Sequence, residues 1–368
     1  LINPFGPSSA QGLAYLQSIQ VNEEARSAKG TMTALDVKGS RSLGKLAGGD
    51  LALALGAEVR TERTQSRASD LLLSDNILGD ATPGDAQFVD RSRKVWAVFG
   101  ELVAPLSKQL ELQVALGHDR YEKIGSTTNP KLGLRYQPAD NLVLRGSVGT
   151  GFRAPSVNDL YRPVKTSATA VLPDPVCMAE NDNDLSTCAD FWETRTYANP
   201  NLKPERSRQL SAGIVFQPHK QLSLGVDYWN ISKRDLISTI GDDVILGNLA
   251  KYEPLVHRYN EDEGLAGCDY DDTDSAICFI ELQKENRGRM KFAGLDFTID
   301  ARGLKSPVGT FGAKLVGTLT LTSKRQFGNG DPYVSNLGRF VTDGVVQRWR
   351  HRITFDWAQG PYSLSLAN

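Results

Sequence analysis

Aromatic and arginine side chains are frequent in the polar segments that separate the regularly patterned parts of this chain. A tyrosine or tryptophan ring offers an apolar face and a polar edge, and a guanidinium can stack on a ring or donate several hydrogen bonds. Such groups can bind a bulky polar molecule, or they can pack against other residues of the same segment. The candidates for ligand contact are Tyr161, Arg162, Trp192, Arg195, Tyr197, Tyr252, His257, Tyr259 and Tyr270.

Residue patterns typical of catalysis or cofactor binding do not occur in the sequence. There is no HExxH zinc motif, no GxSxG nucleophile elbow, no P-loop and no GxGxxG turn after a strand. The histidines, His118, His219, His257 and His351, lie far apart and lack the spacing of paired metal ligands. We therefore expect no enzymatic activity, no metal site and no cofactor.

The four cysteines form two local pairs, Cys177 with Cys188 and Cys268 with Cys278, each inside a polar segment. This spacing favours two short disulfide hairpins in an oxidising compartment. Four unpaired thiols, or one metal site built from all four, are the alternatives. The absence of a CxxC spacing argues against zinc.

The segments between these polar stretches alternate between apolar and polar residues, as strands with one apolar face do. In the clearest one, Leu53 and Leu55 face one way and Glu58 and Arg60 the other. We count about twelve such strands. The predicted polar face carries Arg60, Arg135, Arg145, Asp227, Asp296, Asp300, Lys314 and Asp356. Aromatic residues expected near strand ends on the apolar face are Tyr228, Trp229, Trp349, Trp357 and Tyr362.

Composition narrows the class of protein. The formal net charge is −1 at pH 7, which lacks the excess of cations that nucleic-acid binding requires. No apolar run reaches the eighteen residues of a membrane-spanning helix, but alternating strands can cross a membrane as a barrel. The chain begins at Leu1 and stops at Asn368 inside a predicted strand, so we expect it to be part of a longer protein.

Long and short connections take turns along the chain. The long ones are predicted at residues 64–90, 123–129, 152–203, 233–288 and 324–346, with short turns between them. Strict alternation places every long connection at one end of the sheet, as in outer-membrane barrels with short periplasmic turns and long outward loops. A soluble β-sandwich whose apolar rows face a common core is the alternative.

Two motifs flank the longest early connection. The first is GTGFRAPSVNDLY, residues 149–161, and the second is NPNLKPE, residues 199–205. Pro155 and Pro204 cannot donate to a strand ladder, so both mark places where pairing stops. No helix is expected to follow the glycines, which argues against a phosphate-binding loop. The motifs therefore predict a rim where strands meet a loop.

These two motifs, in this order and beside alternating strands, resemble the barrel signature of TonB-dependent outer-membrane receptors. The stretches ENRGRMKFAGLDFTID and WAQGPYSLSLAN are similar to the family as well, and the resemblance covers nearly the whole chain. It implies an all-β, antiparallel transmembrane barrel of the 22-stranded type, with about twelve strands in residues 1–368 and with the plug domain and final strands absent. The residues that match the rim motifs are Gly151, Phe152, Arg153, Pro155, Tyr161, Asn199, Pro200, Leu202, Pro204 and Glu205.

The same resemblance implies a receptor of the bacterial outer membrane that takes up an iron–siderophore, a cobalamin or an oligosaccharide. It implies contact with outer-membrane lipid, coupling to the TonB energy-transducing complex through the absent plug, and a monomer when full length. A passive channel without a plug and a soluble carbohydrate-binding β-protein are the alternative functions.

Overall fold

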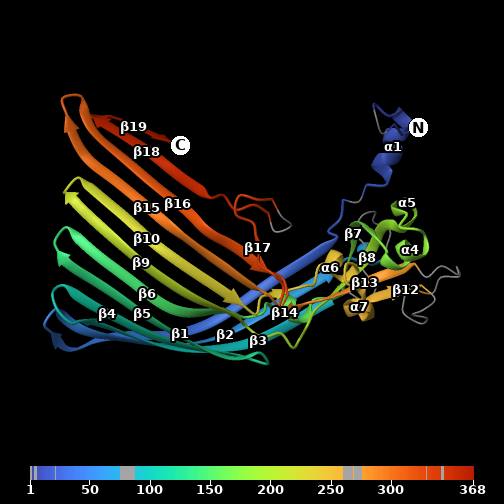
Figure 1. Cartoon of the computed structure of the whole chain (residues 1–368), viewed down its shortest axis with the longest axis horizontal. Coiled ribbons are helices and arrows are strands. Elements are labelled where there is room, and N and C mark those ends of the chain that lie inside the picture. The colour runs from blue at the N-terminus through green and yellow to red at the C-terminus, as the bar shows by residue number, and fades with distance from the viewer. Residues whose placement is uncertain are drawn as a thin grey trace.

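The structure is a computed structural model that describes residues 2–3, 6–20, 22–74, 88–259, 268, 276–328, 330–340 and 344–368. One curved antiparallel sheet of thirteen strands dominates it (Figure 1). Strands pair in the order β1-β2-β3-β4-β5-β6-β9-β10-β15-β16-β18-β19, and the short β17 pairs with β16. Neighbours in the sheet are neighbours along the chain, except where two long loops are inserted after β6 and after β10 and where the short β17 lies between β16 and β18.

The strands of this sheet, called the wall below, are β1 Arg26–Leu46, β2 Gly49–Ala68, β3 Phe88–Pro105, β4 Leu110–Tyr121, β5 Gly125–Ala139, β6 Leu142–Arg153, β9 Glu205–His219, β10 Leu222–Arg234, β15 Arg289–Ser306, β16 Gly309–Gln326, β17 Val334–Ser335, β18 Trp349–Gln359 and β19 Tyr362–Ala367. Two short helices, α1 Ala10–Ser18 and α2 Asp70–Leu73, lie outside it. Among the described residues, no helix is both long and apolar enough to cross a membrane.

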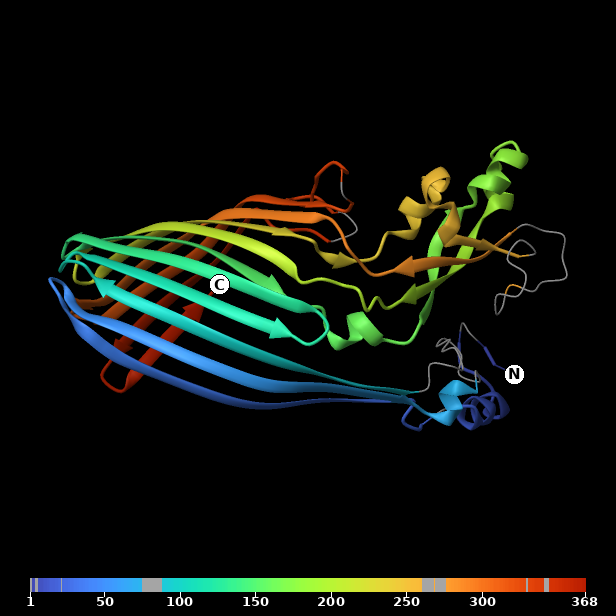
Figure 2. The same ribbon diagram turned by 90° about the horizontal axis from the view of Figure 1, so that it is seen from below.

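The first inserted loop contains α3 Val157–Tyr161, β7 Lys165–Pro173, α4 Pro175–Glu180, α5 Leu185–Cys188 and β8 Ala189–Tyr197. The second contains β11 Ile237–Ser238, α6 Asp242–Leu246, α7 Leu249–Tyr252, the 3₁₀-helix η1 Glu253–Leu255, β12 Val256–Arg258, β13 Ile277–Gln283 and β14 Glu285–Asn286. Both loops leave the same end of the wall (Figure 2).

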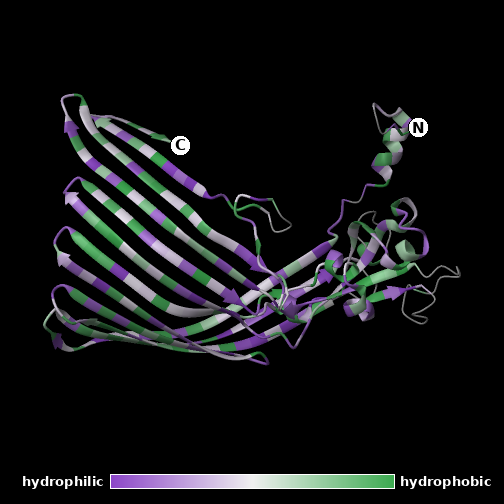
Figure 3. Cartoon of the chain, viewed as in Figure 1, coloured by the Kyte–Doolittle hydropathy of each residue, from purple (hydrophilic) through white to green (hydrophobic). Residues whose placement is uncertain are grey.

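Register places apolar residues on one face of the wall and polar residues on the other. Val59 lies opposite Trp96, and Leu112 opposite Leu134, all on the apolar face. The alternation is visible along the strands in Figure 3. Large side chains of the apolar face, such as Val59, are exposed to the surroundings, as expected for a face turned toward lipid.

The polar face is the inner one. Arg93 lies opposite Glu62 on this face, and its guanidinium donates to the carbonyl of Pro155, which follows β6. The expectation that no helix follows the glycines of the first motif is wrong, because the short helix α3 lies within that motif. It lies against β3 and β2. The chain therefore crosses the polar face when it leaves β6, which requires that face to be concave.

The predicted long connection at residues 123–129 is wrong. β4 ends at Tyr121 and β5 begins at Gly125, so residues 122–124 alone join them. Thr128 lies opposite His118, with Thr128 Oγ1 2.8 Å from His118 Nδ1. Polar residues on both faces remove the hydropathy alternation here, but they do not interrupt the ladder.

Trp229 also departs from its prediction as an apolar-face residue. It lies opposite Gly294 on the polar face, whereas Tyr228 lies opposite Leu295 on the apolar face. A Cβ atom at Gly294 would be 2.4 Å from the indole ring, so the glycine leaves the space that the tryptophan occupies. The other predicted aromatic residues, including Trp349 opposite Leu319, do lie on the apolar face.

Candidate ligand-binding site

The two long loops combine into one small sheet with the order β12-β13-β8-β7. β7 and β8 come from the first loop, and β12 and β13 from the second. β8 and β13 pair in parallel, with Thr194 opposite Ile280. We call these four strands, together with helices α4 to α7 and η1, the loop module. It lies at the end of the wall from which both loops emerge (Figure 2).

Covalent and ionic links hold the loop module together. The predicted disulfides Cys177–Cys188 and Cys268–Cys278 are both present. Arg258 of β12 donates two hydrogen bonds of 2.7 Å to the carboxylate of Asp174, which also caps α4. Both side chains are buried. This ion pair joins the first disulfide hairpin to the second loop.

Helices cover one face of the module sheet. Ile245 of α6, Val256 and Ile280 are buried there, with Trp192 and Tyr252 packed against them. Trp192 Nε1 donates a 2.8 Å hydrogen bond to the carbonyl of Leu172. Two of the predicted ligand-contact residues, Trp192 and Tyr252, thus contribute to the core of the module.

The opposite face of the module sheet brings three other candidates together. Arg195, Tyr197 and His257 lie on this face, where Arg195 is opposite Glu281 in the register. The Arg195 guanidinium carbon is 3.8 Å from the centroid of the Phe279 ring, and the His257 ring stacks on Phe279 at 4.4 Å. His257 Nε2 is 3.4 Å from a carboxylate oxygen of Glu281. Phe279 itself is buried, whereas Arg195, Tyr197, His257 and Glu281 are half-buried. The face therefore offers cations, a carboxylate and a tyrosine side by side, which suits binding of a polar ligand.

The remaining candidates are dispersed. Tyr161 lies in α3, where the Arg91 guanidinium carbon is 5.8 Å from its ring centroid. Arg162 follows α3 and lines a hollow beside β1 and β2. Tyr259 packs on the Cys268–Cys278 disulfide. Tyr270 lies outside the described residues.

The rim motifs connect the first long loop to both ends of the second. Glu205 accepts hydrogen bonds from Arg153 at 2.6 Å and from the backbone N–H of Ile237 at 2.8 Å. Asn199 Nδ2 donates to the carbonyl of Lys284 at 2.8 Å. The adjoining residues Pro155, Leu202 and Pro204 are buried. Strand β6 ends at Arg153 and β9 begins at Glu205, as the two prolines predicted.

Within the first motif, Gly151 and Phe152 contact residues of two other wall strands. A Cβ atom at Gly151 would be 2.9 Å from Ser207 Oγ, so the small residue permits the close contact with β9. The Phe152 ring packs edge-on against Tyr121, with centroids 5.8 Å apart. Pro200 lies in the turn that precedes β9.

Asp159 is the ionic centre of this rim. Its carboxylate accepts from the Lys284 ammonium and from the Ser156 backbone N–H, the latter at 2.9 Å, and Ser156 caps α3 in return. Burial alone would raise the pKa of Asp159, but the hydrogen bonds from Lys284 and Ser156 outweigh it and lower that pKa. The rim contact thus favours the ionised carboxylate.

Lowering the pH is expected to loosen this contact between the two loops. Because the folded-state pKa of Asp159 lies below the unfolded value of about 3.9, its contribution is fully present above about pH 4 and is lost as pH falls through the folded-state value. Proteolysis of the loops as a function of pH measures this effect. Lys284→Met should lower the free energy that holds the two loops together at pH 7 by about 1–3 kcal/mol, so that protease cleaves the loops faster. The variant should also show a weaker dependence of cleavage on acid pH. An acid response unchanged in Lys284→Met would contradict the assignment.

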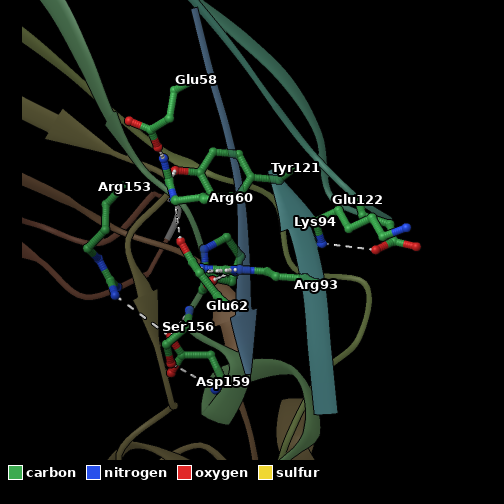
Figure 4. Close-up of polar contacts among 11 residues, drawn as sticks. Glu58, Arg60, Glu62, Arg93, Lys94, Tyr121, Glu122, Arg153, Ser156 and Asp159 are labelled. Atoms are coloured by element: carbon green, nitrogen blue, oxygen red, sulfur yellow. Dashed lines mark hydrogen bonds and ion pairs between the residues drawn. The ribbon is translucent and has the colours of Figure 1, made fainter. Parts of the chain in front are cut away.

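A second polar network lies on the inner face, close to this rim (Figure 4). Arg60 donates to Glu58 at 2.5 Å, to Glu62 at 2.7 Å and to the Tyr121 hydroxyl at 2.9 Å. Arg93 donates to Glu62 at 2.7 Å. These bonds join β2, β3 and β4 across the concave face. They give the space beneath the loop module a charged, hydrogen-bonded lining.

Sequence reasoning missed three residues of the module face, Glu193, Phe279 and Glu281. The signal was present, since Glu193, Arg195 and Tyr197 alternate with Thr194 and Thr196 as strand residues do. It was overlooked because residues 152–203 and 233–288 were interpreted only as long connections between strands. Among the described residues, no cluster of His, Cys, Asp and Glu is arranged to hold a metal ion.

Comparison with known proteins settles the family. A family model described as TonB dependent receptor-like, beta-barrel, matches residues 5–368. The chain belongs to the TonB-dependent receptor family. TonB-dependent receptors are transport proteins of the bacterial outer membrane. The apolar face of the wall is therefore the one that contacts lipid. The predicted fold, an antiparallel transmembrane barrel wall of about twelve strands, is confirmed, and a soluble β-protein is no longer supported.

Solved structures with a similar fold are receptors too. The siderophore receptor PirA from Acinetobacter baumannii is 13% identical, with a TM-score of 0.58 over 92% of this chain and 42% of that one. A mutant ferric enterobactin receptor from Pseudomonas aeruginosa, in complex with enterobactin, is 18% identical, with a TM-score of 0.60 over 91% of this chain and 41% of that one.

The siderophore receptor PirA from Pseudomonas aeruginosa is 14% identical, with a TM-score of 0.56 over 92% of this chain and 48% of that one. The chain therefore spans less than half the length of each of these receptors. At such identities the likeness shows the fold alone. No curated protein sequence matches the chain.

Proposed function

We propose that this chain forms part of the barrel wall and the ligand-capture loops of a receptor for active uptake of a bulky nutrient. The observation that carries the proposal is the loop module, in which two long loops share one sheet and two disulfides. A pre-formed module loses less conformational entropy on binding than two independent loops would. Capture uses the exposed parts of the face formed by Arg195, Tyr197 and His257.

An iron–siderophore is the first ligand class to test. Similar folds occur in proteins described as siderophore receptors, and a face that mixes arginine with aromatic rings suits an anionic chelate. Cobalamin and oligosaccharides are tested as well, because the half-buried ring of Tyr197 could pack against either of them. The family supports a receptor of this general kind.

We further propose that the full-length receptor is a monomer whose plug couples uptake to the TonB complex, with residues 1–368 as one partial barrel domain. The support is the family membership and the concave polar face, on which residues such as Arg60 and Glu62 line the space that a plug would occupy. No catalytic step is part of this function.

Uptake by a strain that lacks the receptor, complemented with the full-length gene, tests the proposal. Iron chelates, cobalamin and oligosaccharides are supplied in turn, with and without a working TonB complex. We expect uptake of one class that stops when TonB is absent. Uptake that continues at an equal rate without TonB would favour the passive channel, and no uptake from any class would overturn the receptor assignment.

A further inference from the structure

A row of cations crosses the apolar face of the wall at its loop end. Arg206 of β9, Arg234 of β10 and Arg289 of β15 lie directly opposite one another in the register. In the next row, Arg208 and Lys291 flank Ser232 in the same way. The alternation of the strands puts these five cations on the face that carries Leu210 and Leu295, not on the inner face. They are called the basic row below: Arg206, Arg208, Arg234, Arg289 and Lys291.

Like charges placed directly opposite one another in a sheet are destabilising unless an anion neutralises them. Within the described part of the chain, the one carboxylate that lies within 4 Å of these cations is Asp235, 3.7 Å from Arg234. All five side chains are exposed. The protein itself thus supplies little counter-charge, and an external anion is needed to balance the row.

The basic row begins where the lipid-facing belt ends. Along β9, Ile214, Ala212 and Leu210 are followed on the same face by Arg208 and Arg206. At the opposite, short-turn end, the same face carries aromatic and aliphatic residues such as Phe216. Long loops of outer-membrane barrels face outward, so the cations lie at the depth of the headgroups of the outer leaflet.

The side chains of the basic row enclose a hollow of about 390 Å³ that Tyr333 also lines. The Tyr333 ring centroid is 5.0 Å from Lys291 Nζ and 5.1 Å from Lys324 Nζ. Lys324 lies opposite Lys291 in the register, so one tyrosine ring contacts both lysines of this pair. The five cations of the basic row are thus gathered around one hollow.

We propose that the basic row binds the phosphorylated headgroups of lipids in the outer leaflet. Arginine matches phosphate with paired hydrogen bonds, and cations near a lipid surface are attracted to anionic headgroups. Binding anchors the wall at a fixed depth beneath the loop module. The site lies on the face opposite the concave one, and the inference rests on the outer-membrane location and not on the identity of the imported ligand.

Binding of a fluorescent, bisphosphorylated glycolipid to the full-length receptor in neutral detergent micelles tests the proposal. The variant combines Arg206→Gln, Arg289→Gln and Lys291→Gln. We expect its affinity for this lipid to fall about a hundredfold, given the attraction of each cation near a charged lipid surface. Its affinity for the same lipid without phosphates should not change.

A matched control removes three exposed cations from the inner face: Lys131→Gln, Arg350→Gln and Arg352→Gln. Lipid affinity of this control should equal that of the unmodified receptor, and equal losses in both triple variants would overturn the proposal. Inorganic phosphate that displaces the lipid at equimolar concentration would assign the site to free phosphate instead of lipid. Nutrient uptake, measured in parallel, reports on the proposed function separately, since lipid binding is scored without any nutrient.

Discussion

Replacing Arg258 by methionine is expected to destabilise the loop module by about 3–5 kcal/mol, because the buried Asp174 carboxylate would lose its cation. The two side chains are 7% and 3% exposed, and two hydrogen bonds of 2.7 Å join them. Hydrogen exchange at the amides of β7, β8 and β13 in the full-length receptor measures the loss. Amides of the wall should keep their protection, since the ion pair lies within the module.

Two further variants make this result specific. Arg302→Met removes an arginine that is 76% exposed in its pair with Asp300, and we expect it to cost at most about 1 kcal/mol. Combining Asp174→Leu with Arg258→Met replaces the buried ion pair by apolar groups and should recover much of the loss. Equal exchange rates in Arg258→Met and Arg302→Met would show that the buried pair does not hold the module.

Replacing Cys177 and Cys188 by serine is expected to weaken nutrient binding while barrel assembly stays intact. The disulfide closes a short hairpin with a sequence separation of 11, and chain entropy assigns such a closure about 3 kcal/mol. Cys188 is buried, and its carbonyl accepts from the backbone N–H of Asp174 at 2.8 Å. Loss of the link should therefore also disturb the ion pair with Arg258.

Affinity of the full-length receptor for its nutrient, measured with and without a reductant, checks this prediction. The double serine variant keeps the Cys268–Cys278 disulfide, so any further loss on reduction belongs to that second link. Barrel assembly is followed by the heat-dependent mobility of the folded protein in gels. Unchanged affinity in the double variant would refute a role for the first disulfide in capture.

Features with a local signature were predictable from sequence. The period-two alternation around Leu53 and Leu55 predicted strands, because successive side chains of a strand point to opposite faces. Pro155 and Pro204 predicted the strand ends at the rim, because proline cannot donate to a ladder. The close spacing of Cys177 and Cys188 predicted their disulfide. Each of these inferences needs no partner from a distant part of the chain.

Where polar residues continued a strand, the hydropathy signal failed. Thr128 pairs with His118 although neither is apolar, so β5 begins earlier than predicted. Trp229 was placed on the wrong face because its neighbour Tyr228 is also aromatic, and one-residue shifts reverse the face in a strand. Gly294 has no side chain and so leaves room for the indole ring. Only the strand register shows that Gly294 lies opposite Trp229.

The sequence by itself determined a lipid-facing and a polar strand face, the positions of the rim and the disulfide pairs, since all of these depend on residues close together in the chain. Tertiary structure decided the loop module and the basic row. Asp174 and Arg258 are 84 residues apart, and Arg206 and Arg289 meet only through β10. Such contacts depend on which strands pair and in what register, and that choice is made by long-range packing, not by local residue patterns.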